Sequence, residues 1–90
     1  MKTFKDLVFE SINDGPMVGK KCRVFFDNGY GASIVSHTYS YGGANGLYEI
    51  AVLDKNGELT YDTSVTNDVI GHLTEDDVTK VLEDIQNLKQ

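Results

Sequence analysis

The chain has 90 residues and a formal net charge of −6. This length allows one hydrophobic core, so we expect a single domain spanning residues 1–90. Hydrophobic residues make up 40% of the chain, which is typical of a globular protein and too high for a disordered tail. The negative charge disfavours direct binding to DNA or RNA, because a phosphate backbone attracts the opposite sign.

The sequence predicts a cytoplasmic protein that does not bind membranes. No apolar run approaches the roughly 18 residues of a membrane-spanning helix, and residues 1–7 lack the apolar stretch of a signal peptide. The single cysteine, Cys22, excludes an internal disulfide and a cysteine-based metal site. Its alternation with Val24 and Phe26 indicates a small buried side chain.

The N-terminal segment is compatible with two structures. Thr3 is suited to cap a short helical turn that ends at Asp6, after which residues 7–9 would run extended. We therefore expect either a short helix or an extra strand before the turn at residues 13–16, which contains the only proline.

Two Asn-Gly turns divide the middle of the chain into predicted strands. Alternating apolar residues predict strands at residues 20–26, 32–40, 47–53 and 59–63. Asn28-Gly29 and Asn56-Gly57 indicate tight hairpins, and residues 41–46 form a glycine-rich loop. These elements predict a four-stranded antiparallel β meander.

The periodicity changes to that of a helix at the C-terminus. One apolar stripe predicts an amphipathic helix near residues 75–88, formed by Val78, Val81, Leu82, Ile85 and Leu88. Thr74 is a favourable N-cap, and Leu73 and Val78 fit a hydrophobic staple around it. The expected fold is α+β, with this helix packed on one face of the sheet.

The second face of the sheet would remain uncovered by a single helix. It carries some of Phe25, Val35, Tyr39 and Tyr41. Three arrangements remain open for this face. It is covered by residues 1–15, buried in a homodimer, or used for binding.

No pattern of catalytic residues is present, so we expect a non-enzymatic protein without a metal or cofactor. His37 and His72 are the only good general bases near neutral pH, and their spacing brings neither next to a nucleophile. The sequence has no His-x-x-x-His pair, and residues 54–58 do not meet the glycine and glutamate spacing of a calcium-binding loop.

Two candidate binding surfaces follow from composition. Residues 39–48 are rich in Tyr, Ser, Gly and Asn, the composition of adaptable recognition loops, and the candidate residues are Tyr39, Tyr41, Asn45 and Tyr48. The alternative is a hairpin connection whose tyrosines pack on the sheet. The second surface is the acidic side of the predicted helix, with Asp76, Asp77, Glu83 and Asp84. Its simpler interpretation is a solvated helix face with favourable charges near its N-terminus.

Four segments together resemble a group of small, uncharacterised proteins encoded by tailed bacteriophages. The segments are residues 1–7, 25–31, 47–53 and 61–78, which read MKTFKDL, FFDNGYG, LYEIAVL and YDTSVTNDVIGHLTEDDV. The group has a proline in place of Ser64 and a different loop length near residues 40–47. The resemblance implies expression inside an infected bacterium, and it carries no known catalytic or ligand residue.

The leading hypothesis is a non-enzymatic phage-type accessory protein that binds and modulates or inhibits a host protein, for example a component of bacterial immunity. It would act through the acidic helix face, the Tyr/Gly loop, or both. This rests on analogy with small acidic phage proteins. One alternative is a protein that sequesters a nucleotide-like signal by stacking it on Tyr39, Tyr41 and Tyr48. Another is a virion or assembly component that associates with copies of itself through its uncovered sheet face and its edge strands.

Overall fold

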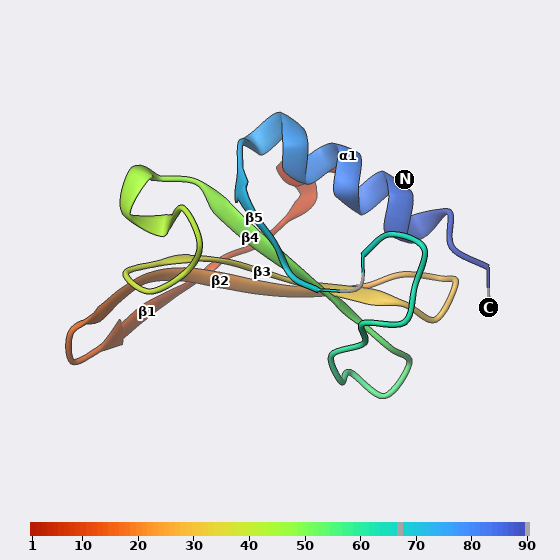
Figure 1. The fold of residues 1–90 in the computed structure, drawn as a ribbon, viewed down its shortest axis with the longest axis horizontal. Helices are drawn as coiled ribbons and strands as arrows, with labels where there is room; N and C mark the ends of the chain where they lie inside the picture. The colour runs from red at the N-terminus through yellow and green to blue at the C-terminus, as the bar shows by residue number, and fades with distance from the viewer. Residues whose placement is uncertain (67, 90) are drawn as a thin grey trace.

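The computed structural model describes residues 1–66 and 68–89. The described chain forms one twisted antiparallel sheet with a helix lying above it (Figure 1). The elements in chain order are η1 (Phe4–Asp6), β1 (Glu10–Asp14), β2 (Met17–Phe25), β3 (Gly31–His37), η2 (Gly43–Asn45), β4 (Tyr48–Leu53), β5 (Ile70–Leu73) and α1 (Glu75–Gln86). In the described ranges no helix combines the length and apolar character needed to cross a membrane.

The α+β prediction is confirmed, but the sheet has five strands instead of four. The strands follow one another in the order β1-β2-β3-β4-β5, each antiparallel to the next. The predicted strand at residues 59–63 is wrong, because only Leu59 forms an isolated bridge, with Leu53. The chain instead loops away and returns as β5, whose Leu73 pairs with Tyr48.

Both structures expected for the N-terminal segment are present. Thr3 and Asp6 form a capping box around η1, and residues from Glu10 onward form β1. A two-residue turn at Gly15 and Pro16 folds β1 back on β2, so that Asp14 pairs with Met17. The strand therefore forms through its turn and its neighbour, although its own sequence lacks an apolar alternation.

The helix and the sheet share one hydrophobic core, as predicted. Cross-strand pairing places Cys22 opposite Ile34, and Ile34 opposite Ile50, on the face beneath α1. The side of α1 that faces this layer buries Val78, Leu82 and Ile85 completely. Ile34, Ile50 and the three helix residues are 0% exposed, and each such burial contributes about 1.5–3 kcal/mol relative to exposure.

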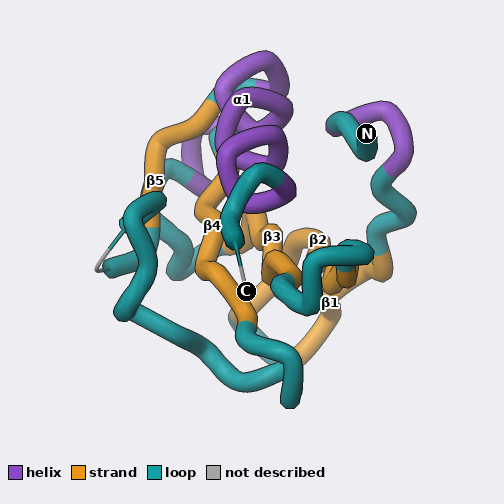
Figure 2. Tube along the Cα trace, turned by 90° about the vertical axis from the view of Figure 1, so that its right-hand side faces the viewer, coloured by secondary structure: helices purple, strands orange, loops and turns teal. Residues whose placement is uncertain are grey.

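Residues 1–15 do not cover the second face of the sheet. Phe4, Leu7 and Phe9 pack against the same core as α1. Figure 2 shows the N-terminal segment rising from β1 toward the level of the helix. On the opposite face, the turn after β4 reaches β2, where Arg23 Nη1 donates to the Gly57 carbonyl at 3.2 Å. One of the three arrangements expected for the second face is thereby removed.

The Asn-Gly hairpin between β2 and β3 is confirmed, with a geometry that differs from the simplest expectation. Phe26 N–H donates to the Tyr30 carbonyl at 2.8 Å, and Gly29 N–H donates to the Phe26 carbonyl at 3.1 Å. Only Gly29 has positive φ, at 90°. The connection is therefore the longer hairpin loop that ends with glycine in the left-handed region, and Asn28 is free for another role.

Asn28 holds the C-terminal end of α1. Its Nδ2 donates to the carbonyl oxygens of Ile85 at 2.8 Å, Gln86 at 3.2 Å and Leu88 at 3.0 Å. Its Oδ1 accepts the N–H of Tyr30 at 3.1 Å. The last carbonyls of a helix lack partners within the helix, so this side chain links the helix end to the hairpin.

We expect Asn28→Ala to lower the free energy of unfolding by about 1–3 kcal/mol, because helix carbonyls lose their donor. Chemical denaturation followed by circular dichroism measures the change. Asn56→Ala is the matched control, because Asn56 lies in the other Asn-Gly turn and is exposed. It should change the value by less than about 0.5 kcal/mol. Equal losses in both variants would contradict the capping role of Asn28.

Candidate functional site

The loop between β3 and β4 presents Tyr39 and Tyr41 at the surface. Their side chains are 64% and 61% exposed. Tyr39 N–H donates to His37 Nδ1 at 3.1 Å, and Tyr41 N–H donates to Glu49 Oε1 at 3.0 Å. Side chains on the neighbouring strands thus hold the backbone of both residues, while both aromatic rings remain available to solvent.

Ser40, between these tyrosines, anchors the loop to the end of β3. Its buried hydroxyl accepts the His37 N–H at 2.9 Å and donates to the His37 carbonyl at 3.1 Å. Gly43 passes so close to the same carbonyl that a Cβ atom would overlap with it. The local sequence Ser-Tyr-Gly-Gly therefore forms a compact, hydrogen-bonded turn.

His72 is a neighbour of Tyr41 that the sequence did not reveal. The two rings are stacked, with centroids 6.5 Å apart and an angle of 26° between their planes. The His72 N–H also donates to the Tyr41 carbonyl at 3.1 Å. His72 has a positive φ of 56°, and it lies where the pairing of β4 with β5 is irregular. The position of His72 depends on strand β5, which no pattern in the sequence predicted.

The four predicted loop residues differ in their exposure to solvent. Tyr39, Tyr41 and Asn45 are exposed, whereas Tyr48 is only 4% exposed and belongs to the core. The Tyr48 ring meets Phe4 edge-on at a centroid distance of 5.2 Å, and Phe9 lies 5.8 Å away. Tyr48 therefore supports the fold and is not available to a partner at the surface.

The acidic residues of α1 differ in their roles. Asp76, Glu83 and Asp84 are exposed, whereas Asp77 is bonded to the N-cap residue Thr74. Thr74 N–H donates to Asp77 Oδ2 at 3.1 Å, and Asp77 N–H donates to Thr74 Oγ1 at 3.1 Å. Asp77 therefore completes a capping box, while the other three carboxylates remain free of this structural task.

The capping bonds also set the acidity of Asp77. The backbone N–H and then the hydroxyl of Thr74 hold the pKa of the Asp77 carboxyl below its ordinary value of 3.8. Asp6 in the box at η1 has a lowered pKa for the same reason, with Thr3 as the donor. Both carboxylates are accordingly charged throughout the neutral range.

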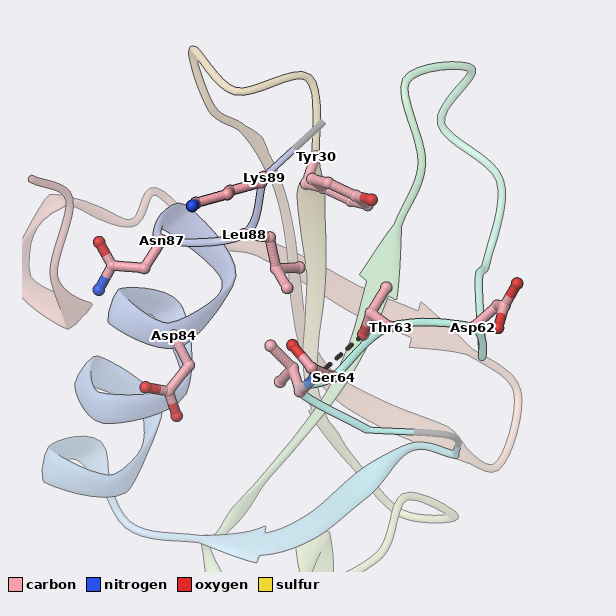
Figure 3. Close-up of a pocket in the computed structure, with 9 residues that line it drawn as sticks. Tyr30, Asp62, Thr63, Ser64, Asp84, Asn87, Leu88 and Lys89 are labelled. Carbon is pink, nitrogen blue, oxygen red and sulfur yellow. Dashed lines mark hydrogen bonds between the residues drawn. The ribbon is translucent and has the colours of Figure 1, made fainter.

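A hollow of about 650 Å³ lies beside the C-terminal end of α1. Its lining comes from the helix end, the β2–β3 hairpin and the loop before β5, and includes Tyr30, Asp62, Asp84 and Lys89. Figure 3 shows the carboxylates of Asp62 and Asp84 on opposite sides of the opening. Because these charged groups do not converge, the hollow lacks the convergent polar groups of a ligand site.

Two smaller hollows lie on the sheet face opposite α1. One, of about 370 Å³, includes Ile12 and Met17 in its lining, and the other, of about 430 Å³, includes Val8 and Arg23. Both include Lys21 and Val35. This mixed apolar and charged surface, lined by residues of β1, β2 and β3, is called the uncovered face below.

Cys22 is 7% exposed, and burial raises the pKa of its thiol. The predicted buried position is confirmed. Among the side chains that the structure describes, no three of the His, Cys, Asp and Glu type gather where they could hold a metal ion.

No protein-family model matches the chain, and neither the curated proteins nor the solved structures contain a significant match.

We expect Thr74→Ala to raise the pKa of Asp77 part of the way toward 3.8, because the hydroxyl is lost while the backbone N–H remains, and to leave that of Asp6 lowered. Thr3→Ala should do the reverse. NMR titration of the side-chain carboxyl carbons measures both values. Because each pKa is depressed by folding, its stabilising contribution is present above about pH 3.8 and is lost as the pH falls through the lower folded value. An unchanged Asp77 titration in Thr74→Ala would contradict the capping assignment.

Proposed function

We propose that this chain is a non-enzymatic protein-binding module, acting as a phage-type accessory protein that binds and modulates a host protein. The supporting observation is the pair of exposed aromatic residues, Tyr39 and Tyr41, on a hydrogen-bonded loop. Aromatic anchors held in place before binding lose little conformational entropy in a complex, and they dominate the energetics of many protein interfaces.

The surroundings of the two tyrosines favour a protein partner over a small ligand. The hollows on the uncovered face and beside α1 do not enclose these rings. A nucleotide would need aromatic faces to stack on, and the burial of Tyr48 removes one of the three rings considered for that purpose. Exposed rings without an enclosing cavity suit insertion into a pocket on a larger partner.

The free carboxylates of α1 are assigned a supporting role. Asp76, Glu83 and Asp84 are exposed, with Lys80 on the same helix. Charges at the rim of an interface mainly accelerate association and discriminate against like-charged partners, and salt weakens their effect. The proposed partner therefore carries a pocket for an aromatic side chain and a basic border.

The test uses tagged protein expressed in host bacteria, followed by quantitative capture of bound proteins. We expect Tyr39→Ala to reduce recovery of the partner at least about tenfold, because truncating a central aromatic anchor costs more than about 1.4 kcal/mol. Tyr39→Phe should retain most binding. Tyr61→Ala is the matched control, because Tyr61 is 48% exposed and lies outside the loop.

A second arm changes Asp76 and Asp84 to Asn and Glu83 to Gln, and keeps Asp77 because it caps the helix. This triple variant should slow association at low salt and have little effect at high salt. A partner that is lost with the triple variant at all salt concentrations, and kept by Tyr39→Ala, would move the binding surface to α1. Recovery of no partner above background would contradict the proposed function.

A further inference from the structure

Strand β1 forms a free edge of the sheet. It pairs with β2 on one side and ends the strand order on the other. Among residues 1–66 and 68–89, no other strand or loop donates a backbone hydrogen bond to its outer side. An edge strand of this kind presents N–H and C=O groups that can pair with another chain.

The pairing of β2 identifies which groups of β1 face outward. Thr38 N–H donates to the Val18 carbonyl, so even-numbered residues of β2 bond toward β3. Odd-numbered residues, such as Gly19, then bond toward β1 and engage Ile12. By alternation, the N–H and C=O groups of Ser11 and Asn13 point away from the sheet.

The edge is only partly protected against association, by the carboxylates of Glu10 and Asp14. Its strand, Glu10–Asp14, contains no lysine and no proline. Val8, just before it, is 82% exposed, the highest exposure among the large hydrophobic side chains described. Natural sheets commonly protect such edges with charged side chains, especially lysine, with proline, or with a covering segment.

We infer that β1 pairs antiparallel with β1 of a second copy, around a two-fold axis at Ser11. In this register, Ser11 faces Ser11 of the second copy, and Asn13 faces Phe9 of the second copy. Outward groups then meet outward groups, as a hydrogen-bonded antiparallel pair requires. The two sheets continue as one across the interface, a self-complementary arrangement typical of two-fold dimers.

The charges on β1 select this register. With the axis at Ser11, Glu10 faces Ile12 of the second copy and Asp14 faces Val8. Moving the axis to Glu10 would place Glu10 opposite its own copy, and moving it to Ile12 would place Glu10 opposite Asp14. Like charges directly opposite each other destabilise strand pairs, which disfavours these two registers. An axis at Asn13 would also avoid such pairs, but it would run the pairing into the turn at Gly15 and Pro16.

Neighbouring residues support the same register. Lys21 pairs with Glu10 on β2, which places a positive charge beside the carboxylate nearest the axis. On the uncovered face, Val8 lies diagonally next to Ile12 of the second copy, within reach of an apolar contact. The dimer therefore covers the exposed Val8 and joins the two uncovered faces into one surface.

Crosslinking tests the register directly, in a Cys22→Ala background that removes the native thiol. Ser11→Cys should form a disulfide-linked dimer under mild oxidation, because directly opposed residues lie about 5.5 Å apart between Cα atoms. Asn13→Cys is the matched control. Asn13 is exposed, as Ser11 is. The Cα atoms of its two copies would lie roughly 14 Å apart along the strands, beyond the reach of a disulfide. Equal crosslinking of both variants would overturn the register.

Sedimentation equilibrium tests the dimer without crosslinking. The unmodified protein should dimerise reversibly, and Ser11→Pro should raise the dissociation constant on the order of tenfold, because each copy loses an outward N–H donor at the axis. Proline is tolerated where a strand N–H points away from its own sheet, and circular dichroism verifies that the fold is kept. Ser11→Ala should dimerise like the original chain.

A monomer at all accessible concentrations would overturn the inference, as would a dimer that Ser11→Pro leaves intact. The inference does not rest on the proposed function, because Tyr39 lies on the β3–β4 loop and not on β1. Tyr39→Ala should therefore leave dimerisation unchanged.

Discussion

The packing of one helix on one face of the sheet is the constraint on which the rest of this structure depends. Val78, Leu82 and Ile85 are completely buried against β3, β4 and β5, and the aromatic side chains of residues 4–9 extend the same layer. The fully buried apolar side chains of the helix and of the central strands thereby lie on one side of the sheet. The opposite face must remain a surface, because the described chain has no second helix to cover it. The one-sided arrangement therefore leaves the uncovered face exposed.

The helix is held near its middle and at its C-terminal end by residues distant in the sequence. Near the N-terminus of the chain, Phe4 N–H donates to Thr79 Oγ1 at 3.0 Å, and Gln86 bonds to the backbone of Lys2. At the C-terminal end, Asn28 donates to the carbonyls of Ile85 and Gln86 in the helix and to that of Leu88 just after it. These contacts satisfy polar groups that would otherwise lose hydrogen bonds at the boundary of the core. The hydrophobic core therefore determines which face of the sheet the helix packs on. The polar contacts determine the position of the helix on that face.

The sequence predicted those elements whose signal is local. Thr74 and the apolar stripe after it located α1, and Asn28-Gly29 located the hairpin between β2 and β3. The failures concern segments whose structure depends on distant partners. Leu59 and Tyr61 alternate like a strand, yet both are 48% exposed and the segment is not paired beyond one bridge. Residues 70–73 form β5 although they contain Gly71 and the positive φ of His72, because β4 offers them a free edge. The Tyr41–His72 contact needed this strand, so sequence patterns alone could not reveal it.

The chain is acidic, but its charge is distributed unevenly, and this leaves the edge at β1 able to associate with a second copy. The net charge of −6 would oppose self-association if it were spread evenly. The helix, however, contacts β3, β4 and β5, so its carboxylates lie above the part of the sheet farthest from β1. Strands are spaced about 4.8 Å apart, which places β4 roughly 14 Å from β1, beyond the screening length of about 8 Å at physiological salt. Near the free edge, Lys21 and Arg23 accompany Glu10 and Asp14, so the local charge is close to balanced. Repulsion between copies thus acts mainly on the helix side, and the edge at β1 remains electrostatically suited to pairing.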